Sequence, residues 1–144
     1  MKVVSSYGVE IKKQNIPIRH TLYIYRQAVG YLIRVYEESW EELSRIVNLQ
    51  KRFNAAEHLV HSPKKNRVRY DFDQKFPKMP SYLRRSAIQH ALGSVSSYET
   101  RLELWKQKKL AGKPKLVYEN HEMPVFYRDV MYKEADDPTD RTFL

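Results

Sequence analysis

The sequence predicts an α+β protein in which helices predominate and both ends of the chain contribute strands to a small β subdomain. Apolar residues recur at helical spacing over residues 18–47 and again over residues 81–110. Apolar and polar residues alternate near the N-terminus, and short β-prone runs follow residue 114. The 144 residues, 42% of them hydrophobic, suffice for one ordinary domain with a packed core.

The first element predicted is a strand within residues 2–13. Tyr7, Val9 and Ile11 alternate with glycine and charged residues, which is the pattern of a strand with one buried face. The Asn-Ile-Pro sequence at residues 15–17 ends it.

Three helical segments come next. Residues 18–47 carry one continuous apolar stripe and predict a single long helix. Residues 50–61 predict a shorter helix, followed by a basic connector. Residues 81–110 predict a third helix, with Ser81 as its N-cap and Gly112 as its stop.

After the third helix, the residue pattern changes from helical periodicity to short β-prone runs. Residues 116–118, 125–127 and 130–132 are short runs rich in valine and aromatic residues, separated by Asn120 and Pro124. They predict strands that join the N-terminal strand in the β subdomain.

The chain is basic, and one stretch supplies the whole excess of positive charge. The formal net charge is +9, and residues 62–115 hold 14 basic and 4 acidic residues, a net +10. The other 12 basic and 13 acidic residues sum to −1. A polyanion is the natural partner of such a stretch, because each Lys or Arg on a phosphate releases counterions.

Several classes of protein are disfavoured. The absence of cysteine excludes disulfides, thiolate zinc sites and a cysteine nucleophile, and fits a reducing compartment. His58 and His61 lack a third ligand, and no nucleophile–base pair or acidic triad is apparent. We therefore expect no metal, no cofactor and no catalytic residue. With no signal peptide and no apolar run of about 18 residues, we expect a cytoplasmic protein without a membrane partner.

Within the basic stretch, Arg85 and Gln89 are the most specific candidates for contacts to DNA bases. They lie four residues apart on a predicted helix, so their side chains reach the same place. Arginine can bridge guanine O6 and N7, and glutamine adenine N6 and N7, if the helix enters a major groove. Tyr82, at the start of the same helix, is a candidate for base stacking.

Part of the chain resembles a known family. Residues 76–98 (FPKMPSYLRRSAIQHALGSVSSY), Trp105, the Gly-Lys-Pro turn at 112–114 and residues 124–131 (PVFYRDVM) resemble the N-terminal portion of TnpB-type proteins. These insertion-sequence OrfB proteins are relatives of the type V CRISPR effectors and act as RNA-guided DNA endonucleases. Before residue 76 the likeness is only in the order strand, long helix, short helix.

The resemblance implies a domain plan. Residues 1–15 and 113–144 would be the two parts of a β-barrel-like wedge, the second one truncated, and residues 16–112 the inserted helical recognition domain. In the family, a nuclease domain with three carboxylates lies further downstream. The chain ends before it, so we expect the nucleic-acid-binding half of such a protein, not an enzyme by itself. The sequence does not tell a natural fragment from a split subunit.

The expected function is binding of a guide RNA and of double-stranded target DNA with its flanking motif. A nuclease half or a second copy of the protein in trans is a further expected partner, and the expected location is the prokaryotic nucleoid. The family implies that Arg85, Ser86 and Gln89 approach the flanking motif, joined by Tyr127 and Arg128. The expected nucleic-acid-binding residues are Lys64, Lys65, Arg67, Arg69, Tyr82, Arg84, Arg85, Ser86, Gln89, Arg101, Lys106, Lys108, Tyr127 and Arg128.

Two other functions stay open at this point. One is a sequence-specific DNA-binding protein that needs no RNA. The other is a helical subunit whose long tyrosine-rich helix, residues 18–47, docks a partner protein.

Overall fold

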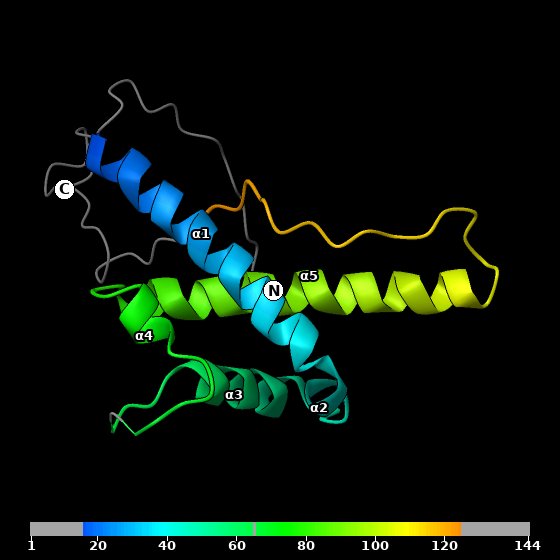
Figure 1. The fold of residues 1–144 in the computed structure, drawn as a ribbon, viewed down its shortest axis with the longest axis horizontal. Helices are drawn as coiled ribbons and strands as arrows, with labels where there is room; N and C mark the ends of the chain where they lie inside the picture. The colour runs from blue at the N-terminus through cyan, green and yellow to red at the C-terminus, as the bar shows by residue number, and fades with distance from the viewer. Residues whose placement is uncertain (1–15, 65, 125–144) are drawn as a thin grey trace, which may run out of the picture.

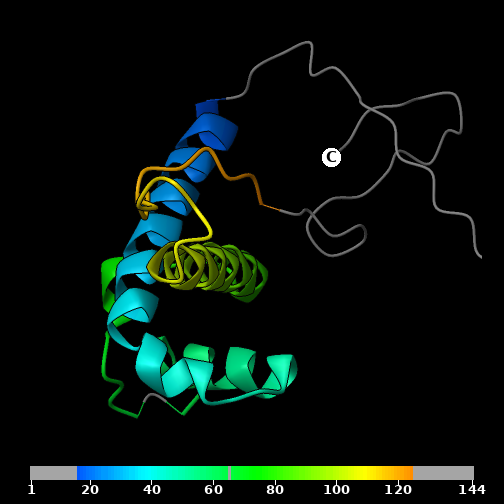
Figure 2. The same cartoon turned by 90° about the vertical axis from the view of Figure 1, so that its right-hand side faces the viewer.

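The computed structural model describes residues 16–64 and 66–124, and in this part of the chain all regular structure is helical (Figure 1). After the last helix, residues 107–124 turn back toward the first one, as Figures 1 and 2 both show. The helices are α1 (Ile16–Glu38), α2 (Trp40–Ser44), α3 (Leu49–Val60), α4 (Phe72–Lys75) and α5 (Ser81–Lys106).

The core forms where the two long helices, α1 and α5, cross. Figure 2 views α5 nearly end-on, with α1 passing beside it and α2 and α3 below. The buried residues of both helices recur every three or four positions, so each helix turns one apolar stripe toward the other. They are Tyr25, Ala28, Val29, Leu32, Ile33, Val35 and Tyr36 of α1, and Leu83, Ala87, Ile88, Ala91 and Val95 of α5. The shorter helices complete the core with Leu43, Ala56, Val60 and Phe72.

The prediction of one helix over residues 18–47 is wrong in its second half. The chain departs from helical geometry at the buried residue Ser39 (φ −99°, ψ 8°), so α1 ends and the short α2 follows. Arg52 of α3 then donates Nε to the carbonyl of Ile46 at 2.9 Å and Nη2 to that of Ser44 at 3.5 Å. These bonds satisfy carbonyls left open at the end of α2, and they depend on a residue from another helix.

The third predicted helix is confirmed, with different ends. Ser81 is the first residue of α5 and not its cap, since Pro80 occupies the N-cap position. The helix stops at Lys106 because Lys108 adopts a left-handed backbone (φ 59°). The amides of Lys108 and Lys109 then donate to the carbonyls of Trp105 and Leu104, each at 2.9 Å. This is the Schellman ending, so Gly112 is not the stop.

The α+β prediction is wrong, because residues 16–64 and 66–124 contain five helices and no strand. The β-prone run at residues 116–118 pairs with no strand among the described residues. Tyr118 instead lies against Arg34 of α1 and donates its hydroxyl to Glu37, and so short a run needs a neighbouring strand to form a sheet. The strands expected within residues 2–13 and after residue 124 lie outside the described residues.

Gly30 explains how the returning chain approaches α1 so closely. A Cβ atom added at Gly30 would lie 2.7 Å from the carbonyl oxygen of Tyr118. Only glycine leaves room for this backbone contact.

In the described ranges, no helix is both long and apolar enough to cross a membrane.

Candidate nucleic-acid interface

Helix α5 changes character along its length. Every buried residue of the helix lies between Leu83 and Val95, and none of residues 96–106 is buried. In Figure 1 this second half extends beyond α1, where only the returning chain accompanies it. Its side chains are therefore available to a partner outside the helical core.

Six exposed cations of the basic stretch lie along this second half and in the turn that follows it. None of the six forms an ion pair with any residue that the structure describes. By contrast, Arg45, Arg69 and Arg85 each lie 2.6–3.5 Å from a glutamate oxygen. The six are Arg101, Lys106, Lys108, Lys109, Lys113 and Lys115, whereas the other exposed cations of the stretch without an ion pair among the described residues, Lys64, Arg67, Lys75 and Lys78, precede α5. Lys113 also lies over the Trp105 ring, 5.5 Å from its centroid.

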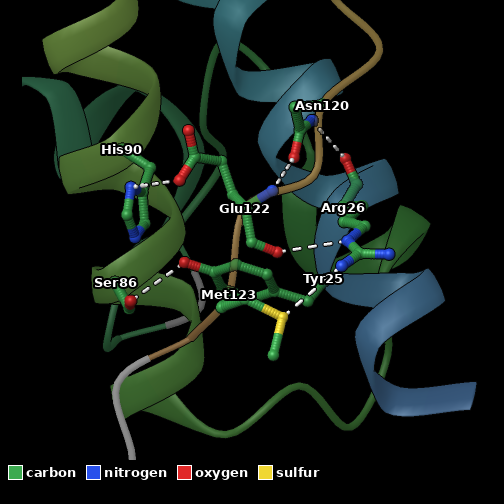
Figure 3. A network of polar contacts seen from close by, with 7 residues as sticks. All are labelled: Tyr25, Arg26, Ser86, His90, Asn120, Glu122 and Met123. Atoms are coloured by element: carbon green, nitrogen blue, oxygen red, sulfur yellow. Dashed lines mark hydrogen bonds and ion pairs between the residues drawn. The ribbon is translucent and has the colours of Figure 1, made fainter. Parts of the chain in front are cut away.

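A network of polar contacts holds the returning chain between α1 and α5 (Figure 3). Asn120 donates Nδ2 to the carbonyl of Arg26 at 3.1 Å, and Arg26 donates Nε to the carbonyl of Glu122 at 3.2 Å. The carboxylate of Glu122 reaches across to α5, where Oε2 lies 3.0 Å from His90 Nδ1. The segment that follows the basic turn (residues 107–115) is thus anchored at the crossing of the two long helices.

A second contact in Figure 3 joins the same helices inside the core. The hydroxyls of Tyr25 and Ser86 share a hydrogen bond of 2.9 Å. Burial raises the pKa of Tyr25, the bond to Ser86 lowers it, and the charge of Glu122 adds a smaller upward effect. Ser86 is 8% exposed, so its hydroxyl serves the packing of α1 on α5 and does not face solvent.

The arginines expected to bind DNA are placed differently from one another. Arg84 is buried, and its Nε has no hydrogen-bond partner among the described residues. Arg85 is half exposed, with Nε 3.5 Å from Glu57 Oε2 and the guanidinium 5.4 Å from the Phe53 ring centroid. The charge of Arg85 is therefore partly neutralised before any ligand arrives.

Gln89 lies where three shallow hollows meet on the outward side of α5. The largest, about 440 Å³, runs between α5 and the returning chain and reaches Arg101 and Lys115. The other two, about 360 and 310 Å³, lie on the side of α3. The hollow beside the returning chain is lined by Gln89, His90, Gly93, Ser94, Ser97, Arg101, Lys115, Leu116, Val117 and Glu122.

The structure divides the other predicted binding residues. Arg101, Lys106 and Lys108 lie together around the second half of α5. The exposed residues Lys64 and Arg67 belong to the connector after α3, on another side of the bundle in Figure 1.

Arg69 of the same connector lies 3.1 Å from Glu42 of α2. Tyr82 is 43% exposed at the start of α5 and borders the 310 Å³ hollow. Lys65, Tyr127 and Arg128 lie outside the described residues.

Several residues of this interface were not singled out from the sequence. Lys109, Lys113 and Lys115 join the cations of α5 because the chain turns back after the helix. In the sequence, only their contribution to the positive charge of residues 62–115 pointed to a role in binding. Ser94 and Ser97 carry no pattern that distinguishes them, and only the neighbouring chain turns them into the lining of a hollow.

The geometry offers no centre for metal chemistry in the described ranges. No three side chains of histidine, aspartate or glutamate gather there as metal ligands would.

The profile of the Aq_aa04 family matches residues 5–144 of this chain. The chain belongs to the Aq_aa04 family. The match includes all the described residues, and so both the α1–α5 crossing and the basic turn are parts of the family's sequence. No curated protein and no solved structure matches the chain.

Proposed function

We propose that this protein binds nucleic acid and holds duplex DNA along the second half of α5 and the basic turn. The observation that carries the proposal is the group of six exposed cations without ion pairs among the described residues. Cations already paired with carboxylates must lose that partner before they bind a phosphate, whereas these need not.

The shape of the α5 surface also supports binding of duplex DNA. Between Arg85 and Arg101 the helix exposes Gly93 and Ser97, two small residues that would let a phosphate backbone approach. The two arginines are separated by about 24 Å along the helix axis and by about 160° around it, so the exposed row between them winds around the helix. Gln89 lies between them, and we propose it as the residue that reads a base edge.

The finer form of the proposal comes from the resemblance to TnpB-type proteins. In that form the protein also holds a guide RNA and is associated with the prokaryotic nucleoid. The RNA-independent form is distinguished by purification with nuclease treatment. Co-purified RNA of a defined size would favour the guided form, and unchanged duplex binding after its removal would favour the independent form.

A salt titration tests the proposal. We expect the double variant Arg101→Ala/Lys115→Ala to bind a labelled DNA duplex more weakly than the unmodified protein. The slope of log affinity against log salt concentration should fall by about one unit for each phosphate that the variant no longer binds. Fluorescence anisotropy at several salt concentrations measures both quantities.

Lys51→Ala provides the matched control, because Lys51 is an exposed cation on α3 outside the hollows. It should leave the slope unchanged. If Lys51→Ala lowered the duplex affinity and the salt slope as much as the double variant does, net charge alone would account for binding. The absence of duplex binding in dilute buffer would refute the proposal. Gln89→Ala should weaken preferred sequences by about 1–3 kcal/mol relative to random duplex.

A second candidate function is a protein-interaction subunit, favoured by apolar exposure between α2 and α3. Val47 is 86% exposed and Leu49 is 74% exposed. Leu49 also borders the 360 Å³ hollow together with Trp40 and Phe53. Tight association with a partner protein, together with negligible and salt-insensitive DNA affinity, would favour this function over the first.

A further inference from the structure

A further hollow lies away from the basic half of α5. It has a volume of about 880 Å³, larger than the three hollows around Gln89 and within the range of sites that hold small organic ligands. The outer face of α1 forms one wall, and the returning chain at residues 118–121 and residues 75–77 at the end of α4 form the others. None of the nucleic-acid-binding residues predicted from the sequence lines it.

Aromatic rings and cations alternate in this hollow. The ammonium group of Lys75 lies 4.8 Å from the ring centroid of Tyr31, and the guanidinium of Arg34 lies 4.1 Å from that of Tyr118. Tyr31 also meets the ring of Phe76 edge-on at 5.8 Å. The two cations therefore sit on ring faces at the walls of the hollow.

Tyr23 adds an aromatic side chain that is open to a ligand. It is 62% exposed and lines the hollow on the same face of α1 as Arg34, three helical turns earlier. Between them, Gln27 is exposed and offers both a donor and an acceptor. An exposed ring and a guanidinium plane are the two surfaces on which unpaired bases stack in protein complexes.

The charge of the lining favours an anionic ligand. Three cations, Arg26, Arg34 and Lys75, and one carboxylate, that of Glu119, line the hollow. Both wall tyrosines are neutral at physiological pH. Burial raises the pKa of Tyr31, and the hydrogen bond that Tyr118 donates to Glu37 raises its pKa.

We propose that this hollow binds unpaired nucleotides of a single-stranded nucleic acid. A base stacks on Tyr23, a second base stacks on the guanidinium of Arg34, and Gln27 bonds a base edge between them. Lys75 and Arg26 hold the phosphates. Aromatic rings interleaved with cations are the means by which proteins bind single strands without sequence preference. The inference rests on the proposed function in that both ligands are nucleic acids, but it assigns a second and separate site.

Binding of short oligonucleotides to the full chain tests the inference. The probes are labelled oligo(U), labelled oligo(dT) and a blunt DNA duplex, each measured by anisotropy. Tyr23→Ala should weaken both single strands by about 5–150-fold, the loss expected for one stacked base. Tyr23→Phe should retain most of the affinity because it keeps the ring. Equal affinity for the two strands would identify recognition of base and phosphate, and a preference for oligo(U) would identify contacts to the 2′-hydroxyl.

The measurements with the blunt DNA duplex distinguish this inference from the proposed function. Tyr23→Ala should leave duplex binding unchanged, and Arg101→Ala/Lys115→Ala should weaken the duplex more than the single strands. Duplex binding together with no single-strand binding, or with full single-strand binding by Tyr23→Ala, would overturn this inference alone. Failure to bind any of the three probes would overturn the proposed function and the inference together.

Discussion

The first and second halves of α5 are one continuous helix with two different surroundings. Residues 83–95 place their apolar side chains against α1 and α3, and Ile88, Ala91 and Val95 are 0% exposed. In residues 96–106 no side chain is buried, and the nearest companion is the turn that follows the helix. Burial stabilises the first half, whereas the second half owes its order to continuity with the first and to its own ending.

This difference determines where the protein can carry a binding surface. Side chains that hold the α1–α5 crossing cannot also contact a ligand, as the buried Ser86 and Arg84 illustrate. Beyond the crossing, the helix is free to carry polar and cationic residues at little cost to the core. A change of the same kind should therefore have different effects in the two halves.

Removal of apolar volume should show the largest contrast. Ile88→Ala deletes a fully buried side chain from the first half and should lower the free energy of unfolding by about 2–5 kcal/mol. Leu102→Ala deletes as many carbon atoms from the second half, where the side chain is only partly buried, and should cost less than about 1.5 kcal/mol. Urea denaturation followed by circular dichroism measures both. Equal losses would mean that the second half is packed as tightly as the first.

Glycine substitution should have effects of opposite sign at two positions. Gly30→Ala forces the returning chain away from α1 and should destabilise by about 1–3 kcal/mol, with faster amide exchange in residues 116–124. Gly93→Ala on α5 meets nothing within 4 Å and should stabilise the helix by about 0.5–1 kcal/mol. Hydrogen exchange and thermal denaturation record these changes. A loss of stability in Gly93→Ala would reveal a close neighbour of α5 at that point.

Alkaline pH should weaken the core through the buried Tyr36. Burial raises the pKa of Tyr36, whose hydroxyl donates to the carbonyl of Ala56 at 3.2 Å. Because the folded pKa lies above the unfolded value, this contribution is complete below about pH 10 and is lost as the pH rises further.

Tyr36→Phe should therefore cost about 1 kcal/mol at pH 8 and flatten the decline of stability above pH 10. Unfolding free energies at a series of pH values, compared with the unmodified protein, measure the difference. Parallel declines in the two proteins would show that Tyr36 ionises as readily in the folded as in the unfolded chain.

The smallest effect is expected at the end of the second half. Lys108 holds a left-handed conformation that glycine adopts without strain, so Lys108→Gly should stabilise the protein by a few tenths of a kcal/mol to about 1 kcal/mol. Lys106→Gly, inside the last turn of α5, should instead destabilise by about 1 kcal/mol. Thermal denaturation of the pair locates the end of the helix. A destabilised Lys108→Gly variant would place that end elsewhere.

Local patterns in the sequence determined which segments are helical and where the charge lies. The spacing of apolar residues predicted α1, α3 and α5, and the buried side chains of α1 and α5 follow those stripes, because amphipathic helices bury their apolar faces. The count of charges located the basic stretch to which Arg101, Lys106 and Lys108 belong.

The tertiary structure decided what each β-prone or cationic residue contacts. Residues 116–118 have β propensity, but in this protein Tyr118 packs on α1, at the place where Gly30 has no side chain. Arg52 sets the end of α2 from a different helix, and Glu57 and Glu42 neutralise Arg85 and Arg69. Such contacts join residues of different elements, and neither propensity nor periodicity carries information about which partner on another element a side chain meets.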